Sequence, residues 1–221
     1  MSGPARTGTP ATGNDLPPWS VLHEHRRALE RRWPSVFSLP LVRRSSDLVL
    51  ASAAPGARVL EVGAGDRRLK PRLEAAAPGL DYRSVDPDPA HPHDGADLAD
   101  AEGTFDLVFA LEFVEHLSPG EAFAFLRRAH DLLRPGGRIL LSTPDVFTPG
   151  RWHRDADHRT PFSPWELGGF LEAAGFRVES LHRAWNAPLA ERVLRRFLLG
   201  WLHRLMGHDY AYSVVATAVR A

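Results

Sequence analysis

Short apolar runs alternate along this chain with segments in which apolar residues recur at helical spacing. Runs that predict buried strands lie at 58–62, 82–85, 105–110, 138–143 and 176–181, and a final one lies at 213–219. Segments that predict helices lie at 17–33, 40–54, 67–76, 119–134, 164–174 and 189–206. Strands that alternate with helices over short connections are typical of a parallel α/β sheet. The pattern shows no clear strand at 94–99.

Two of the predicted helices begin with a capping box, in which a serine and a glutamate three positions later satisfy free backbone N–H groups. The pairs are Ser118 with Glu121 and Ser163 with Glu166. Between these helices, residues 144–162 form a long connection that is rich in aromatic and charged side chains. Connections of this length are usually functional or disordered, and its composition favours a functional loop, a lid over a site.

The apolar run at 58–62 leads into a Gly-x-Gly turn formed by Gly63 and Gly65. Glycine has no Cβ, so such a turn lets backbone approach a ligand closely at the carboxyl end of a strand. Asp86 follows the next strand, about 20 positions further on, where a carboxylate can accept hydrogen bonds from two ribose hydroxyls. The alternative for the glycine turn is a tight strand-to-helix turn without a ligand, and the alternative for Asp86 is a solvated turn aspartate. Asp66, Arg67 and Arg68 follow the turn, and the third glycine that a dinucleotide-binding fingerprint has after this turn is absent.

Length and charge narrow the classes of protein. The chain has 221 residues, enough for one domain with a substantial core, and its 27 basic and 27 acidic residues balance. Balanced charge argues against bulk binding of nucleic acid. No apolar run of about 18 residues predicts a transmembrane segment, and the start lacks a signal-peptide pattern, so the expected location is cytoplasmic. Residues 1–16 are predicted to be a disordered tail, 17–54 N-terminal helices and 55–221 the main domain.

Motifs along residues 55–181 occur in the order and spacing of a known family. They are the segment 59–65, Asp86, the run 105–108, the segment 111–117, the stretch 133–137 and the stretch 174–176. Together they resemble class I S-adenosylmethionine-dependent methyltransferases. The resemblance implies a Rossmann-like, seven-stranded, mostly parallel sheet with helices on both faces and an antiparallel last strand at 213–219. The missing strand would then lie inside a stretch assigned to helix.

The resemblance also implies S-adenosylmethionine as cofactor. In the family pattern Asp86 holds the ribose, Asp97 and Leu98 flank the adenine, and the glycine turn faces the methionine end. The implied cofactor-binding residues are Glu61, Gly63, Ala64, Gly65, Asp86, Asp97, Leu98, Ala110 and Leu111. This chain departs from the pattern where Asp66, Arg67 and Arg68 replace a further small residue or glycine.

The segment Glu112-x-x-Glu115-His116 is similar to the cluster that ubiquinone-forming methyltransferases associate with a divalent cation. The alternative is that Glu112 and His116 pair and cap within one helical turn. We favour that alternative and assign no metal ligand. For the removal of a proton from an acceptor, the candidates for the general base are His116 and His158, since imidazole titrates near neutrality.

These features predict transfer of a methyl group to oxygen or nitrogen of a small-molecule acceptor. The alternatives are a nucleotide-dependent oxidoreductase and a catalytically silent binding module of the same fold. The helix predicted at 189–206 has a broad apolar face with a cationic border. We expect this face to pack on the sheet as core, and the alternatives are that it covers the acceptor pocket or contacts a membrane surface or a second subunit.

Overall fold

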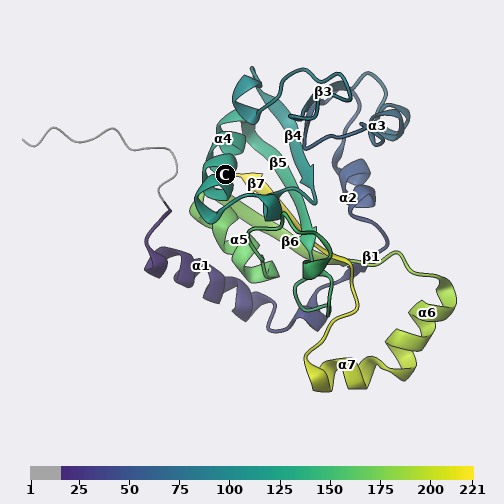
Figure 1. The fold of residues 1–221 in the computed structure, drawn as a ribbon. Helices are drawn as coiled ribbons and strands as arrows, with labels where there is room; N and C mark the ends of the chain where they lie inside the picture. Colours follow the sequence, from purple (N-terminus) through teal and green to yellow (C-terminus); the bar gives the residue numbers. More distant parts are fainter. Residues whose placement is uncertain (1–15) are drawn as a thin grey trace, which may run out of the picture.

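The computed structural model describes residues 16–221, so the predicted tail lies outside the described residues except for Leu16. Its centre is one seven-stranded sheet in the order β1-β6-β7-β5-β4-β2-β3 (Figure 1). β7 is antiparallel to both of its neighbours, and the other pairs are parallel, as the family resemblance implies. The strands are β1 (Leu41–Val42), β2 (Arg58–Val62), β3 (Asp81–Val85), β4 (Phe105–Leu111), β5 (Leu133–Pro144), β6 (Phe176–Ala184) and β7 (Ser213–Arg220).

Helices cover both faces of the sheet. On one face, α1 (Trp19–Arg32), α4 (Pro119–Leu132) and α5 (Pro164–Ala173) pack against apolar side chains such as Leu60 and Val108. On the other face, α2 (Ser45–Ser52) and α3 (Lys70–Ala76) pack against Val59 and Leu107. Adjacent residues of one strand therefore serve opposite cores, because side chains alternate across a pleated strand. Among the residues described, no helix combines the length and the apolar content needed to cross a membrane.

The serine caps confirm both predicted helix starts, and of the two predicted capping boxes the one at Ser118 forms in full while the one at Ser163 forms only its serine half. Ser118 Oγ accepts from the Glu121 backbone N–H, and Glu121 returns the bond to the Ser118 N–H, at the start of α4. Ser163 Oγ accepts from the Glu166 backbone N–H at the start of α5. Each pair satisfies backbone groups that a first helical turn leaves free.

The missing strand lies in the stretch predicted as one helix over 40–54, so that prediction is wrong for its first residues. β1 pairs in parallel with β6, and α2 begins at Ser45. The Pro40 and Val42 carbonyls accept from the backbone N–H groups of Arg183 and Trp185. Pairing with a distant strand thus decides the local conformation. The spacing of apolar residues within 40–54 carries no information about that partner strand. Within the described chain, the stretch 94–99 contributes only an isolated bridge to the sheet, between Val85 and Gly95, and then enters a 3-10 turn (Leu98–Asp100).

The segment 189–206 is not one continuous helix. It comprises α6 (Leu189–Val193), a π-helical turn (Leu194–Leu198) and α7 (Gly200–Met206). The expectation that its apolar face packs on the sheet is wrong. Large apolar side chains of this segment are more than half exposed: Phe197 72%, Leu198 63%, Trp201 65%, Leu205 75% and Met206 55%.

Candidate active site

The candidate site lies at the carboxyl ends of the central parallel strands. Gly63 follows β2, Asp86 follows β3 and Glu112 follows β4, and these strands are neighbours in the sheet. Carboxyl ends of parallel strands meet at one edge, which is where open α/β sheets bind ligands. The fold therefore brings together residues that are far apart in the sequence.

The glycine turn has the backbone that the sequence predicts. Gly63 and Gly65 have φ of +69° and +48°, in the left-handed region that favours glycine. The Gly65 N–H donates to Asp86 Oδ2 at 2.8 Å, and the Asp88 N–H donates to Asp86 Oδ1 at 2.8 Å. Asp86 is thereby fixed beside the turn, and each carboxyl oxygen keeps a lone pair for a further donor.

A cavity of about 830 Å³ opens beside this turn. Its lining includes Gly63, Asp97 and Leu98 together with Phe113 and Leu117. Asp97 Oδ1 accepts from the Ala99 N–H and so caps the short turn that carries Leu98, whose side chain is buried. The cavity is within the size range of pockets for small ligands and cofactors.

The Phe113 ring lies so close to Gly63 that it requires a residue without a side chain there, in addition to the left-handed backbone. Sequence reasoning did not predict this contact. A Cβ placed at Gly63 would lie 2.7 Å from Phe113 Cδ2. By contrast, a Cβ at Gly65 would meet no described atom within 4 Å. The contact between residues 63 and 113 joins the ends of β2 and β4, and only the folded sheet reveals it.

Six of the nine predicted cofactor residues lie outside the lining of this cavity, among them Gly65 and Asp86. Glu61 is buried and accepts a hydrogen bond of 2.5 Å from the Tyr82 hydroxyl, and burial raises the pKa of Glu61 to about 7. Ala64 and Ala110 are buried, and Leu111 packs on the α2–α3 side of the sheet. Their assigned roles toward the cofactor remain predictions.

Glu112 begins a second group of polar residues at the end of β4. Its backbone has φ of +52°, unusual for a side chain with a Cβ. The Glu112 N–H donates to the Ser142 carbonyl at 3.0 Å, and Ser142 Oγ donates to Glu112 Oε1 at 2.7 Å. Burial of its carboxyl group raises the pKa of Glu112. β5, which carries Ser142, thus holds Glu112 in a conformation that a free chain would disfavour.

Glu115 is fully buried, and neither of its carboxyl oxygens has a hydrogen-bond partner among residues 16–221. Burial, followed by the nearby charge of Glu112, raises the pKa of Glu115 to about 8. Its backbone carbonyl accepts from the N–H groups of Arg159 and Thr160, at 2.7 and 3.0 Å. The end of the 144–162 loop is therefore anchored on the same short turn that carries Glu115.

This anchoring brings His116 and His158 together. Their ring centroids lie 5.0 Å apart, and His116 Nδ1 lies 3.2 Å from Asp157 Oδ2. His158 Nδ1 lies 2.8 Å from the Trp152 carbonyl oxygen. Because a carbonyl only accepts, this nitrogen carries a proton, and neutral His158 then has its lone pair on Nε2.

Glu115, His116 and His158 each place one ligand atom within 4.8 Å of the others. A buried carboxylate without a partner and two imidazoles suit a divalent cation. The metal-ligand set considered in the sequence, Glu112 with Glu115 and His116, is thus only partly assembled, and His158 takes the place of Glu112 in the geometric cluster.

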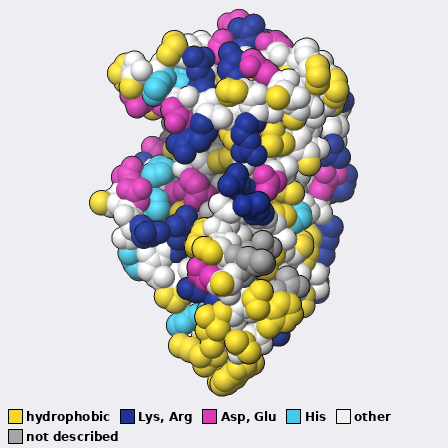
Figure 2. All heavy atoms as spheres, turned by 90° about the vertical axis from the view of Figure 1, so that its right-hand side faces the viewer, with side chains coloured by type: hydrophobic (Ala, Val, Ile, Leu, Met, Phe, Trp, Pro, Cys, Tyr) yellow, Lys and Arg dark blue, Asp and Glu magenta, His cyan; other side chains and the backbone are white. Residues whose placement is uncertain are grey.

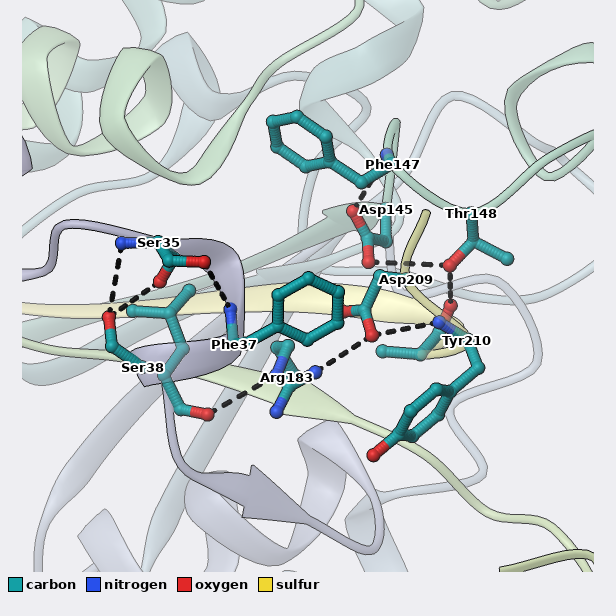
Figure 3. Close-up of polar contacts among 11 residues, drawn as sticks. Ser35, Phe37, Ser38, Asp145, Phe147, Thr148, Arg183, Asp209 and Tyr210 are labelled. Atoms are coloured by element: carbon teal, nitrogen blue, oxygen red, sulfur yellow. Dashed lines mark hydrogen bonds and ion pairs between the residues drawn. The ribbon is translucent and has the colours of Figure 1, made fainter. Parts of the chain in front are cut away.

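A further buried polar cluster lies where β5 ends and the chain enters β7 (Figure 3). Arg183 donates to Asp209 Oδ1 at 2.7 Å, and the Phe147 N–H donates to Asp145 at 3.0 Å. Burial and the neighbouring Asp209 raise the pKa of Asp145. The Thr148 hydroxyl donates to the Ala211 carbonyl, so the cluster ties the start of the 144–162 loop to the residues before β7. Sequence reasoning did not single out this cluster.

Comparison with known proteins fits this arrangement. The family described as methyltransferase domain matches residues 25–181, more than half of the chain. The chain belongs to the S-adenosylmethionine-dependent methyltransferases. A ubiquinone biosynthesis O-methyltransferase of Azorhizobium caulinodans is 31% identical over 160 residues, which cover 66% of this chain and 56% of that relative. The chain spans about a third to a half of the length of the curated relatives it matches.

Solved methyltransferases share the fold. An S-adenosylmethionine-dependent methyltransferase from Archaeoglobus fulgidus has a TM-score of 0.63 at 17% identity. The match covers 91% of this chain and 99% of the Archaeoglobus chain. The [4+2]-cyclase SpnF has a TM-score of 0.57 at 18% identity, over 79% of each chain. Because a cyclase shares the architecture, the fold alone does not establish methyl transfer, and the site must carry that argument.

Proposed function

We propose that this protein transfers the methyl group of S-adenosylmethionine to an oxygen or nitrogen atom of a small-molecule acceptor, with His116 or His158 as general base. The observation that carries the proposal is that Phe113 and Leu117, which flank the short turn bearing His116, both line the 830 Å³ cavity. The turn that carries His116 therefore joins two residues of the cavity wall, while His116 and His158 themselves lie outside the lining. Family membership supports the same activity.

The residues present fit S-adenosylmethionine. Gly63 leaves the cavity wall without a side chain, and the free lone pairs of Asp86 suit the two ribose hydroxyls. Asp97 is exposed at the lining, and its second carboxyl oxygen suits the adenine amino group. When bound, the cofactor supplies an electrophilic methyl group, so the protein has to align the acceptor and remove its proton.

His158 is the stronger candidate for the general base. Its bond to the Trp152 carbonyl leaves Nε2 to accept a proton from an acceptor hydroxyl. His116 Nδ1 lies 3.2 Å from Asp157 Oδ2 but makes no hydrogen bond within the described residues, so this imidazole is less firmly oriented. Both histidines belong to the turn and loop that Glu115 joins, so closure of residues 144–162 over an acceptor would set their positions.

Two observations favour an oxygen acceptor and a cation. The relatives that match over part of their length are named O-methyltransferases, which supports oxygen. Glu115, His116 and His158 would hold a divalent cation, and its charge, in place of a free His158 Nε2, would then favour the deprotonated form of an acceptor hydroxyl, because a nitrogen that binds a cation has no lone pair left for a proton. The unpartnered buried carboxyl of Glu115 is the feature of this chain that favours the cation over the metal-free alternative.

Binding and transfer can be tested separately. S-adenosylhomocysteine should raise the melting temperature, whereas NAD should not, because a ligand stabilises the state that binds it. Transfer of labelled methyl groups should then be measured over a panel of catechols, other phenols and amines, with and without magnesium. Stabilisation by NAD alone would favour the oxidoreductase, and cofactor binding without transfer to any acceptor would favour the silent module.

The base is tested by His158→Gln and His116→Gln, with His153→Gln as the matched control because His153 is an exposed residue of the same loop. The variant of the true base should lose about 10²–10⁴-fold in turnover and keep its affinity for the cofactor. Near-normal turnover in both single variants would mean that transfer rests on alignment alone.

A further inference from the structure

The segment 189–206 exposes an unusual amount of apolar surface. Leu198, Trp201, Leu205 and Met206 are 55–75% exposed, and Val193 and Leu194 are also exposed. Figure 2 shows apolar side chains gathered at the lower end of the molecule, where Figure 1 places α6 and α7. Single exposed apolar residues are normal, but contiguous patches of this kind mark interaction sites.

One side of α7 is held against the body of the protein. The His203 ring packs against the Tyr210 ring at a centroid distance of 5.1 Å, and the Arg204 guanidinium lies 5.9 Å from the Phe37 ring centroid. Trp201 and Leu205 are on the same helix and stay exposed. Their exposure is therefore a property of a docked helix that presents its other side to the surroundings.

The charge of the segment identifies the kind of surface that it suits. Residues 192–208 contain four arginines and two histidines, with no aspartate or glutamate. Glu191, just before them, pairs with Arg195 at 2.9 Å. A symmetric contact with a second copy would bring like charges together, because the same patch meets itself across a two-fold axis. An anionic lipid surface instead offers both opposite charge and an apolar layer.

The position of the segment is consistent with that surface. It connects the carboxyl end of β6 to the start of β7, and β6 runs parallel to β1 within the sheet. The segment therefore leaves the sheet at the edge where the parallel strands end, the edge that also carries the candidate active site.

We propose that residues 189–206 bind the surface of an anionic lipid bilayer. Trp201, Leu205 and their apolar neighbours would enter the boundary between headgroups and acyl chains, and the net positive charge of residues 192–208 would attract the anionic headgroups. The inference goes beyond the proposed function and does not depend on it.

Co-sedimentation with vesicles tests the proposal. The full chain should pellet with vesicles of phosphatidylcholine and phosphatidylglycerol, and much less with phosphatidylcholine alone or at high salt, since salt screens the headgroup charge. The double variant Trp201→Ser/Leu205→Ser should bind these vesicles at least roughly tenfold more weakly than the unaltered protein. The matched control is Trp19→Ser on α1, because Trp19 is 71% exposed on another helix. It should bind vesicles as the unaltered protein does.

Two further measurements separate the outcomes. Both variants should keep their melting temperature within about 2 °C, because exposed side chains contribute little to stability. Light scattering across protein concentrations would detect self-association. The proposal is overturned if the unaltered protein does not bind anionic vesicles, if the double variant binds them equally, or if the double variant abolishes a dimer instead.

Discussion

The contact between Gly63 and Phe113 predicts different consequences for two neighbouring glycines. In Gly63→Ala and Gly65→Ala the new side chain occupies a left-handed backbone, with φ of +69° and +48°, at a cost of about 1–2 kcal/mol each. At Gly63 the added Cβ would also lie 2.7 Å from Phe113 Cδ2, whereas at Gly65 nothing lies within 4 Å. Overpacking of this kind adds about 1–3 kcal/mol. Gly63→Ala should therefore lose roughly 2–5 kcal/mol, and Gly65→Ala roughly 1–2.

The assay is equilibrium denaturation of both variants beside the unaltered protein. For a domain of this size 1 kcal/mol corresponds to about 2–4 °C in melting temperature, so the two variants are distinguishable. The clash can be isolated by Phe113→Leu, which removes the ring. In that background Gly63→Ala should cost less, and the difference is the coupling between the two positions.

The reasoning is refuted if both alanine variants lose equal stability, or if Phe113→Leu leaves the cost of Gly63→Ala unchanged. Calorimetric titration with S-adenosylhomocysteine adds a second test, because Gly63 lines the cavity. A folded Gly63→Ala variant with undiminished affinity would separate the glycine turn from the cofactor.

Three other predictions concern single side chains. Asp86→Ala should weaken cofactor binding about tenfold or more by calorimetry while the fold survives, since charge-assisted hydrogen bonds contribute about 1.5–3 kcal/mol. Burial beside Asp209 raises the pKa of Asp145, so native Asp145 keeps a proton that the unfolded chain loses near its ordinary value of 3.8. Stability from this group is present below that pH and is lost as pH rises toward the native pKa. Asp145→Asn should flatten the decline measured by urea denaturation between about pH 5 and pH 8. Glu115→Gln should abolish any stimulation of transfer by magnesium, and persistent stimulation would exclude Glu115 as a ligand.

Much of the fold was predictable where local signals agree. The apolar run of β2, the capping serines of α4 and α5, and the alternation of strands and helices all act within a few residues. β1 was not predictable, since two residues become a strand only because the β6 backbone lies beside them. The start of β5 at Leu133 has the same origin: the Pro-Gly-Gly sequence predicts a break, yet Leu133 pairs with Phe105 before the register shifts.

The candidate site divides in the same way. The spacing of Gly63, Gly65 and Asp86 predicted one corner, because the order of strands places them together. The proximity of His158 to Glu115 depends on backbone bonds across the 144–162 loop, which no periodicity contains. The segment 189–206 shows a different limit. The same apolar spacing suits a buried helix and an interfacial one, and only the exposure of Trp201 and its neighbours distinguishes them.

One buried carboxyl group of this fold has lost its contact with water without gaining a hydrogen-bond donor from the part of the chain that the structure describes. Most ion pairs among the described residues have at least one exposed partner, and such pairs contribute little to stability. Glu61, Glu112 and Asp145 are shielded from water, but Tyr82, Ser142 and the Phe147 N–H respectively donate to them. Glu115 is fully buried, more deeply than the part-buried Glu112, and its carboxyl oxygens have no hydrogen-bond partner within residues 16–221. Removing water from a carboxyl group without a hydrogen bond destabilises the native state. A proton or a cation would relieve that penalty, and both act at the turn that also holds His116. The least satisfied group in this part of the chain thus lies where the proposed chemistry needs a charge to appear or disappear.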